Sequence, residues 1–191
     1  MKYRFLVGLM LSGMLLLLAG GQAQAQASSS VKNLGTFGND FHLTDPEGKE
    51  RSFGEFRGKA VMLFFGFTQC PAVCPTTLAT AAGVRKLLGK DAERLQVIFV
   101  TIDPERDSAA VLKNYAAAFD PTILGLRTDM AHTKKVAKAF NIFYEKVPTG
   151  GSYTMDHTAF SFIFDGKGDF RQAVHHGQSA EQVAADVRQL L

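Results

Sequence analysis

Three apolar runs of strand length dominate the pattern of hydrophobic and polar positions along the chain. They cover residues 60–67, 95–102 and 159–164. Each run is mostly apolar on both faces of an extended chain, which is typical of interior strands in an α/β sheet covered on two sides. Residues 41–43 add a strand that enters a turn, because Asp45-Pro46-Glu47-Gly48 places proline and glycine at turn positions.

Helical periodicity fills the segments between these runs. The predicted helices cover 75–88 with Gly89 at the C-terminal end, 108–119, 130–140, and a last segment from Ser179, which opens a capping box with Gln182. A short strand at 123–126 and a hairpin strand at 170–174 complete the set. This order predicts an α/β fold with a central mixed sheet flanked by helices, parallel in its first part and closed by an antiparallel hairpin. We find no internal repeat.

The N-terminal segment has the three parts of a secretory signal peptide. Lys2 and Arg4 precede an apolar run at 5–18, and small residues follow up to Ala27. The run has 14 residues, whereas a membrane span needs about 20. We therefore predict an exported periplasmic protein with a cleaved signal peptide. The alternative is an uncleaved anchor in the inner membrane that leaves the protein facing the periplasm, and only then does it contact a membrane.

The chain divides into three predicted parts. Residues 1–27 form the predicted signal peptide, and 28–40 are rich in serine and glycine, which predicts a flexible N-terminal arm. Residues 41–191 form the predicted folded domain, and we expect it to be monomeric.

Composition and charge exclude two broad classes. With 46% hydrophobic and 20% charged residues, the chain can bury a core, unlike a disordered protein. The net charge is +3, but two of the 21 basic residues lie in the first 27 positions, leaving 19 against 18 acidic residues. This near-neutral body argues against a nucleic-acid binder. The 16 phenylalanines, with no tryptophan, are expected mainly to fill the core.

The candidate chemistry begins with the only two cysteines, Cys70 and Cys74. A disulfide that closes so small a ring stabilises little, so metal binding or redox chemistry is favoured. The pair follows the first buried strand, at the sheet edge where ligands collect in α/β folds. Pro75 suits the first helical position, which predicts Cys74 at the helix N-cap, where the helix dipole favours a thiolate.

Two thiolates need a histidine to complete a metal site. Among the five histidines, His157 is the best candidate because it immediately precedes the buried strand at 159–164. Two thiolates and one imidazole suit Cu(I) and are incomplete for structural zinc. A core histidine bonded to Asp156 or to the backbone is the alternative. His175 and His176 are adjacent, so on a strand they face opposite sides and seldom reach one ion.

Three segments together resemble one protein family. They are FGFTQCPAVCPTTL at 65–78, TIDPERDS at 101–108 and YTMDHTAFSFIFD at 153–165, and they resemble the SCO/SenC family of copper chaperones, which have a thioredoxin-like fold. The resemblance implies that Cys70, Cys74 and His157 bind copper, as Cu(I) and also as Cu(II), and that Asp156 is a neighbour of the ligand. It also implies a role in assembling the binuclear copper centre of cytochrome c oxidase.

The chain departs from the family pattern at two positions. Family members often read THCPDVCP, whereas Gln69 and Ala72 stand here in place of the histidine and the aspartate. Neither position carries a copper ligand, so the departures bear on binding strength. The loop 103–107 has two open interpretations: a structural one, in which Asp107 or Ser108 caps the next helix, and a functional one.

The leading hypothesis is a chaperone that carries copper to an exported apo-protein, the oxidase subunit with the binuclear copper site. A copper donor protein and a thiol reductant are the other expected partners. The alternative is a thiol-disulfide oxidoreductase that uses Cys70 and Cys74 to reduce the cysteines of that copper site. The CxxxC spacing, and Met155-Asp156-His157-Thr158 where oxidoreductases carry a proline, favour the chaperone. A peroxiredoxin is disfavoured because Phe64 replaces its proline, and a copper or redox sensor is compatible with the same three residues.

Overall fold

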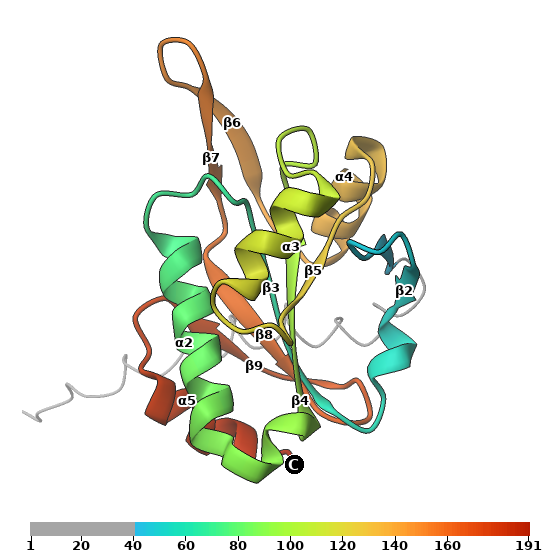
Figure 1. Ribbon diagram of the computed structural model, residues 1–191, viewed down its shortest axis with the longest axis vertical. Helices are drawn as coiled ribbons and strands as arrows, with labels where there is room; N and C mark the ends of the chain where they lie inside the picture. Colours follow the sequence, from blue (N-terminus) through green and yellow to red (C-terminus); the bar gives the residue numbers. More distant parts are fainter. Residues whose placement is uncertain (1–40) are drawn as a thin grey trace, which may run out of the picture. The chain divides into compact units, whose positions relative to one another are not determined.

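The computed structural model describes residues 41–191, and the predicted signal peptide and N-terminal arm lie outside them. A five-stranded sheet with the strand order β5-β4-β3-β8-β9 forms the centre (Figure 1). Its strands are β3 (Ala60–Gly66), β4 (Leu95–Thr101), β5 (Leu124–Leu126), β8 (Phe160–Phe164) and β9 (Phe170–His175). The first three are parallel, and β8 and β9 each run antiparallel to their neighbours. The predicted mixed sheet is confirmed.

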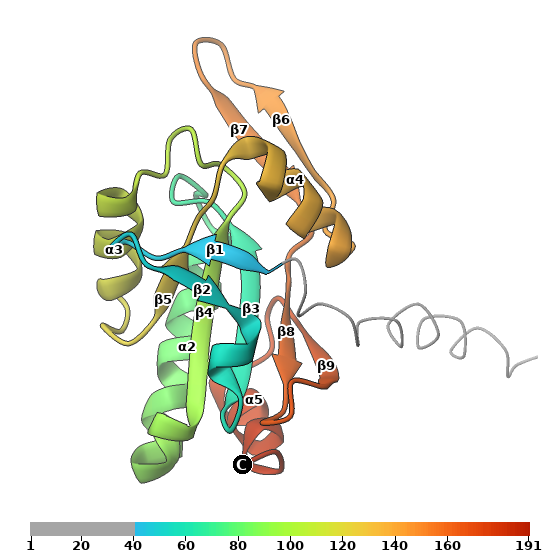
Figure 2. The ribbon, with the colours of Figure 1, turned by 90° about the vertical axis from the view of Figure 1, so that its right-hand side faces the viewer.

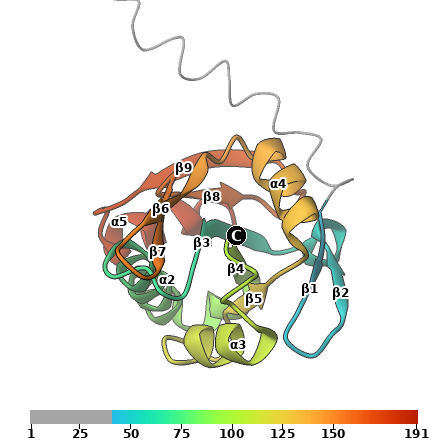
Figure 3. The same cartoon turned by 90° about the horizontal axis from the view of Figure 1, so that it is seen from above.

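Helices cover both faces of this sheet. They are α2 (Val73–Leu88), α3 (Ala109–Ala117), α4 (Met130–Ala139) and α5 (Ala180–Arg188), and short 3₁₀ helices occupy Phe53–Phe56 and Gly89–Arg94. Figures 2 and 3 show α2 and α3 on one face of the sheet and α4 on the other. All four predicted helices are present. Ser108 and Ser179 cap α3 and α5 with their side chains, which confirms Ser108 as the cap after the 103–107 loop.

The core has two layers, separated by β3. All seven residues of β3 are buried, and because side chains alternate along a strand, the two sets face opposite layers. Ala60, Met62 and Phe64 pack in one cluster with residues of α2, α3 and α5. On the other side, Phe65 contacts Phe140, with ring centroids 5.1 Å apart. Further aromatic pairs extend this second layer, including Phe41–Phe53, Phe53–Phe164 and Phe140–Phe162. Many of the phenylalanines thus fill the core, as predicted.

Two small hairpins lie outside the sheet, and of their four strands the sequence analysis predicted only the first, at 41–43. One pairs β1 (His42–Thr44) with β2 (Glu50–Ser52), and the other pairs β6 (Tyr144–Pro148) with β7 (Tyr153–His157). The β6-β7 hairpin projects beyond the end of the sheet, at the top of Figure 1. It brings the predicted ligand His157 to the edge of the sheet where β3 ends.

Among residues 41–191, none of the helices combines the length and the apolar character that a membrane crossing requires.

Candidate metal centre

The two cysteines lie where the chain passes from β3 to α2. Both are free thiols, with Cys70 half-buried in the connecting loop and Cys74 buried at the second position of α2. Gly66, the last residue of β3, makes room for the second sulfur. A Cβ atom at this position would lie 2.6 Å from Cys74 Sγ and 3.0 Å from a ring carbon of Phe99. Only glycine allows the strand and the sulfur to approach so closely.

The start of α2 differs from the prediction. The helix begins at Val73 with Ala72 as its N-cap, so the predicted N-cap at Cys74 is wrong. Pro75 is the third residue of the helix, where it is tolerated because the first amides of a helix have no intrahelical partner. Ala72 offers no capping side chain, and the Cys74 amide instead donates a hydrogen bond to Cys70 Sγ over 3.4 Å. The Cys70 sulfur thus receives a donor from the first turn of the helix.

Burial dominates the electrostatics of Cys74. Desolvation raises the pKa of the Cys74 thiol, a hydrogen bond with the Phe67 backbone lowers it, and the nearby Cys70 and Asp107 raise it further. The expectation that Cys74 is the activated thiol is therefore wrong for the metal-free protein, because the sequence did not show how deeply the sulfur is buried. A bound cation reverses this effect, since a thiol that coordinates a metal is deprotonated.

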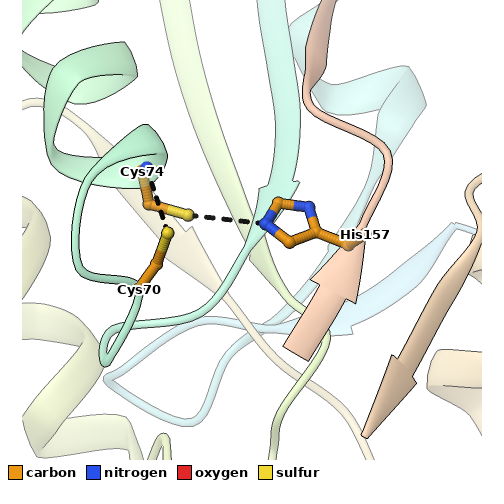
Figure 4. A group of neighbouring side chains, drawn as sticks. All are labelled: Cys70, Cys74 and His157. Atoms are coloured by element: carbon orange, nitrogen blue, oxygen red, sulfur yellow. Dashed lines mark hydrogen bonds between the residues drawn. The ribbon is translucent and has the colours of Figure 1, made fainter. Parts of the chain in front are cut away.

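His157 presents one ring nitrogen to the sulfurs. Its Nε2 lies 3.9 Å from Cys74 Sγ (Figure 4). Its Nδ1 lies 2.9 Å from the carbonyl oxygen of Thr158. A carbonyl oxygen can only accept a hydrogen bond, so Nδ1 carries the proton and Nε2 keeps its lone pair. Burial lowers the pKa of His157, although the Thr158 carbonyl and the charge of Asp156 raise it. The imidazole is thus held in the neutral tautomer that binds metals.

The three predicted residues form one cluster. The donor atoms of Cys70, Cys74 and His157 all lie within 4.8 Å of one another, and no other cluster of at least three metal-binding side chains of this kind occurs in residues 41–191. Asp156 is exposed and outside the cluster. Two soft sulfurs and one imidazole nitrogen form a three-donor set that suits Cu(I) better than Zn(II), which takes four ligands in structural sites.

The other four histidines lie outside this cluster. His42 bonds to Glu50 on the exposed β1-β2 hairpin. His132 lies on α4. His175 and His176 are exposed at the end of β9, and only His175 packs near an aromatic ring, that of Phe160.

Asp107 anchors the cysteine loop through hydrogen bonds. It is fully buried, and its carboxylate accepts hydrogen bonds from the Thr68 amide at 3.1 Å and the Thr68 hydroxyl at 2.6 Å. The Thr101 hydroxyl donates a third, at 2.5 Å. This residue of the 103–107 loop therefore fixes the chain two residues before Cys70 to the end of β4. The sequence analysis left this role open because the partners lie 39 residues apart.

Comparison with known proteins places this arrangement in a family. The model of the SCO1/SenC family matches residues 30–191. The chain belongs to the SCO1/SenC family. The SCO2-like protein of Rickettsia felis is 32% identical over 149 residues, which cover 76% of this chain and 73% of that protein. The mitochondrial SCO2 homologue of Bos taurus is 31% identical over 169 residues, covering 86% of this chain and 64% of its own, so about a third of that relative lies outside the match.

A solved structure of a similar protein contains bound copper. The structure of Bradyrhizobium japonicum ScoI with copper bound is 42% identical to this family member, covers 79% of this chain and 97% of its own, and has a TM-score of 0.74. The similarity in fold confirms the thioredoxin-like architecture predicted from the sequence.

Proposed function

We propose that this protein is a copper chaperone that binds Cu(I) through Cys70, Cys74 and His157. It delivers the ion to an exported apo-protein, the cytochrome c oxidase subunit that carries the binuclear copper site. The observation that carries the proposal is the convergence of two sulfurs and an unprotonated Nε2 within 4.8 Å, from segments more than 80 residues apart. The copper-bound relative at 42% identity supports the choice of metal.

The burial of the three donors suggests how the ion is held and released. Cys74 is the inner ligand, because this residue is fully buried, whereas Cys70 is half-buried and is the cysteine that an incoming thiolate would reach first. Transfer proceeds by ligand exchange: a recipient thiolate binds the copper as the bond to His157 breaks. A second recipient ligand then replaces Cys70, and the bond to the inner ligand Cys74 breaks last, when the recipient holds the ion. Each step keeps the ion coordinated, and its oxidation state does not change.

An anaerobic Cu(I) competition titration of the reduced protein against a chromophoric chelator tests this proposal. We expect one tight equivalent in the wild type, loss of that equivalent in Cys70→Ala or Cys74→Ala, and clear weakening in His157→Ala. His42→Ala is the matched control, because it removes a histidine outside the cluster. A full tight equivalent in either cysteine variant would overturn the ligand assignment.

We further propose that the protein acts in the periplasm after cleavage of residues 1–27, together with a copper donor and a thiol reductant. The charged start, the apolar run at 5–18 and the small residues before Ala27 support this proposal. The intact mass of the protein recovered from the periplasmic fraction tests it. A mass that includes residues 1–27, in the membrane fraction, would favour the uncleaved anchor.

A thiol-disulfide reductase is the second candidate, and the unequal burial of the two cysteine residues favours it. The accessible Cys70 thiolate would attack a disulfide of the recipient, and Cys74 would resolve the mixed disulfide. The recipient then gains two thiols, and this protein is left with a Cys70–Cys74 disulfide. His157→Ala separates the functions, because it weakens copper binding and spares disulfide reduction.

A further inference from the structure

The candidate ligand His157 reaches the site on a hairpin that has little support from the sheet. Strands β6 and β7 pair with each other and with no strand of the five-stranded sheet in the described part of the chain. Four of the five β6 residues are exposed, and Figures 1 and 2 show the hairpin extending past the other elements. A two-stranded hairpin is marginally stable in water by itself. Contacts with the rest of the domain must therefore fix its position.

Arg106 connects the hairpin to the loop that carries the cysteines. Its Nε donates to Asp103 Oδ2 at 2.5 Å, and its Nη1 donates to the Tyr153 carbonyl at 2.6 Å and to Gln69 Oε1 at 3.1 Å. Gln69 precedes Cys70, and Tyr153 is the first residue of β7. One guanidinium group thus bonds to the segment that carries the cysteines and to the strand that carries the histidine.

Tyr153 completes the connection from the hairpin side. Its hydroxyl donates to Asp103 Oδ1 at 2.8 Å, and its ring centroid lies 3.6 Å from the Arg106 guanidinium carbon. The Lys146 ammonium lies 4.5 Å from the same ring and also bonds to the exposed Glu105. We refer to Asp103, Arg106 and Tyr153 as the latch. Lys146 and Glu105 form a separate surface pair beside it.

The latch acts on the face of β7 that carries the ligand. Side chains alternate along a strand, so Tyr153, Met155 and His157 share one face. Four residues of strand separate Tyr153 from His157 by about 13 Å, so the latch holds one end of the strand whose other end presents the imidazole. A change in the angle of β7 at Tyr153 therefore displaces Nε2 relative to the sulfurs.

We propose that Arg106 and Tyr153 are positioning residues that keep His157 within bonding distance of copper, so that the site holds Cu(I) with three ligands instead of two. This inference rests on the proposed copper site. Asp103 is fully buried and the Arg106 side chain is 16% exposed. A buried ion pair is weak evidence for stability, because desolvation offsets its attraction, and its best-attested role is to select one geometry. Here the geometry that the ion pair selects is the position of the β6-β7 hairpin relative to the cysteine loop.

X-ray absorption at the copper K edge of the Cu(I)-loaded protein tests the inference. The edge feature assigned to the 1s→4p transition is stronger for two-coordinate than for three-coordinate Cu(I), and His157→Ala supplies the two-coordinate reference. We expect Arg106→Lys and Tyr153→Leu to shift the spectrum toward that reference. Both variants should weaken Cu(I) binding by about tenfold or more, as supporting contacts of metal ligands often do. Two sulfur scatterers should remain in each.

Three comparisons keep this test decisive. Arg106→Lys retains a charge for the buried Asp103, but its single nitrogen cannot bond to Asp103 and at the same time take the place of Nη1 between Gln69 and Tyr153. Tyr153→Leu leaves the ion pair intact. Lys146→Met removes the surface pair and should keep the wild-type spectrum. Three-coordinate spectra in both folded latch variants, checked by circular dichroism, would overturn the inference. Two-coordinate copper in the wild type would overturn it as well, whereas absence of a tight Cu(I) equivalent in the wild type would instead refute the proposed function.

Discussion

The missing side chain of Gly66 determines where the Cys74 sulfur can lie. The sulfur occupies the space that a Cβ atom would take at the end of β3. Gly125 on β5 is crowded in a similar way, because a Cβ there would lie 2.7 Å from Leu112 Cγ, but no cysteine is among its nearest atoms. Substitutions at these two glycines therefore distinguish the loss of stability caused by overpacking from the displacement of the Cys74 sulfur.

We expect Gly66→Ala to displace Cys74 Sγ and weaken Cu(I) binding, while it destabilises the protein by about 1–3 kcal/mol through overpacking. Gly125→Ala should lower stability by a similar amount and leave Cu(I) affinity unchanged. Urea unfolding and the chelator competition titration measure the two quantities. Equal Cu(I) affinities in the two variants would show that the position of the sulfur tolerates the added methyl group.

At this scale, the three clustered donors were predictable, but their surroundings were not. Cys70, Cys74 and His157 stand in motifs whose residue types and order carry the chemistry. The sequence did not show that Gly66 determines the position of the Cys74 sulfur, because this role depends on a contact with a residue eight positions away. The bonds of Arg106 to Gln69 and Tyr153 span 37 and 47 residues, and only the folded chain brings those segments together.

At the scale of elements, the same turn is built twice. Asp45 accepts hydrogen bonds from the amides of Glu47 and Lys49 and from Arg51. Asp165 likewise accepts from the amides of Lys167 and Asp169 and from Arg171. In both, a glycine three residues after the aspartate has a positive φ, +83° at Gly48 and +86° at Gly168. These two turns join β1 to β2 and β8 to β9. The repeat escaped the sequence analysis because it is only seven residues long.

The hydrogen bonds of Asp45 in the first of these turns predict a pH-dependent contribution to the stability of the protein. Burial raises the pKa of Asp45, but hydrogen bonds from the Lys49 amide and Arg51 outweigh it, so the pKa lies below 3.8. The unfolded chain therefore binds this proton more tightly, and the stabilisation is present above pH 3.8 and lost as the pH falls through the folded pKa. Asp45→Asn should cost about 1–3 kcal/mol near neutral pH.

Urea unfolding of the wild type and Asp45→Asn between neutral pH and pH 3 measures this contribution. The difference between their unfolding free energies should shrink below pH 4. A difference that stays constant over this range would show that the charge of Asp45 does not contribute. Asp91→Asn is a suitable control, because this exposed residue makes only a 4.0 Å surface contact with Arg94.

The elements that sequence patterns predicted are those whose faces are buried. The strands β3, β4 and β8 and the four helices follow apolar periodicity, which burial imposes. Strand β6 was missed because four of its five residues are exposed and it contains Pro148, so it shows no alternation of polar and apolar residues. Gly150 and Gly151, both with positive φ, were the available signal for this hairpin.

At the scale of the whole molecule, the main hydrophobic cluster of the core is built without the candidate metal site. The cluster between the sheet and α2, α3 and α5 contains neither His157 nor the two cysteines. The aromatic layer on the other face likewise closes through phenylalanine contacts. Folding and copper binding are therefore expected to be separable.

We expect the metal-free protein and the Cys70→Ala/Cys74→Ala variant both to unfold cooperatively. Cu(I) should raise the melting temperature of the wild type only, because a ligand at a thousandfold excess over its Kd stabilises the folded state by about 4 kcal/mol. Differential scanning calorimetry under anaerobic conditions measures both effects. A metal-free wild type without a thermal transition would show that folding depends on the ion.

The unequal burial of the two cysteines also bears on the proposed delivery of copper. Cys74 is buried, whereas Cys70 and His157 are half-buried, so under the proposed function a donor and a recipient would both reach the ion from the side of Cys70 and His157. Two partners that use one opening cannot occupy it together. We therefore expect loading and unloading to alternate in a ping-pong sequence, with an excess of either partner inhibiting the other half of the cycle.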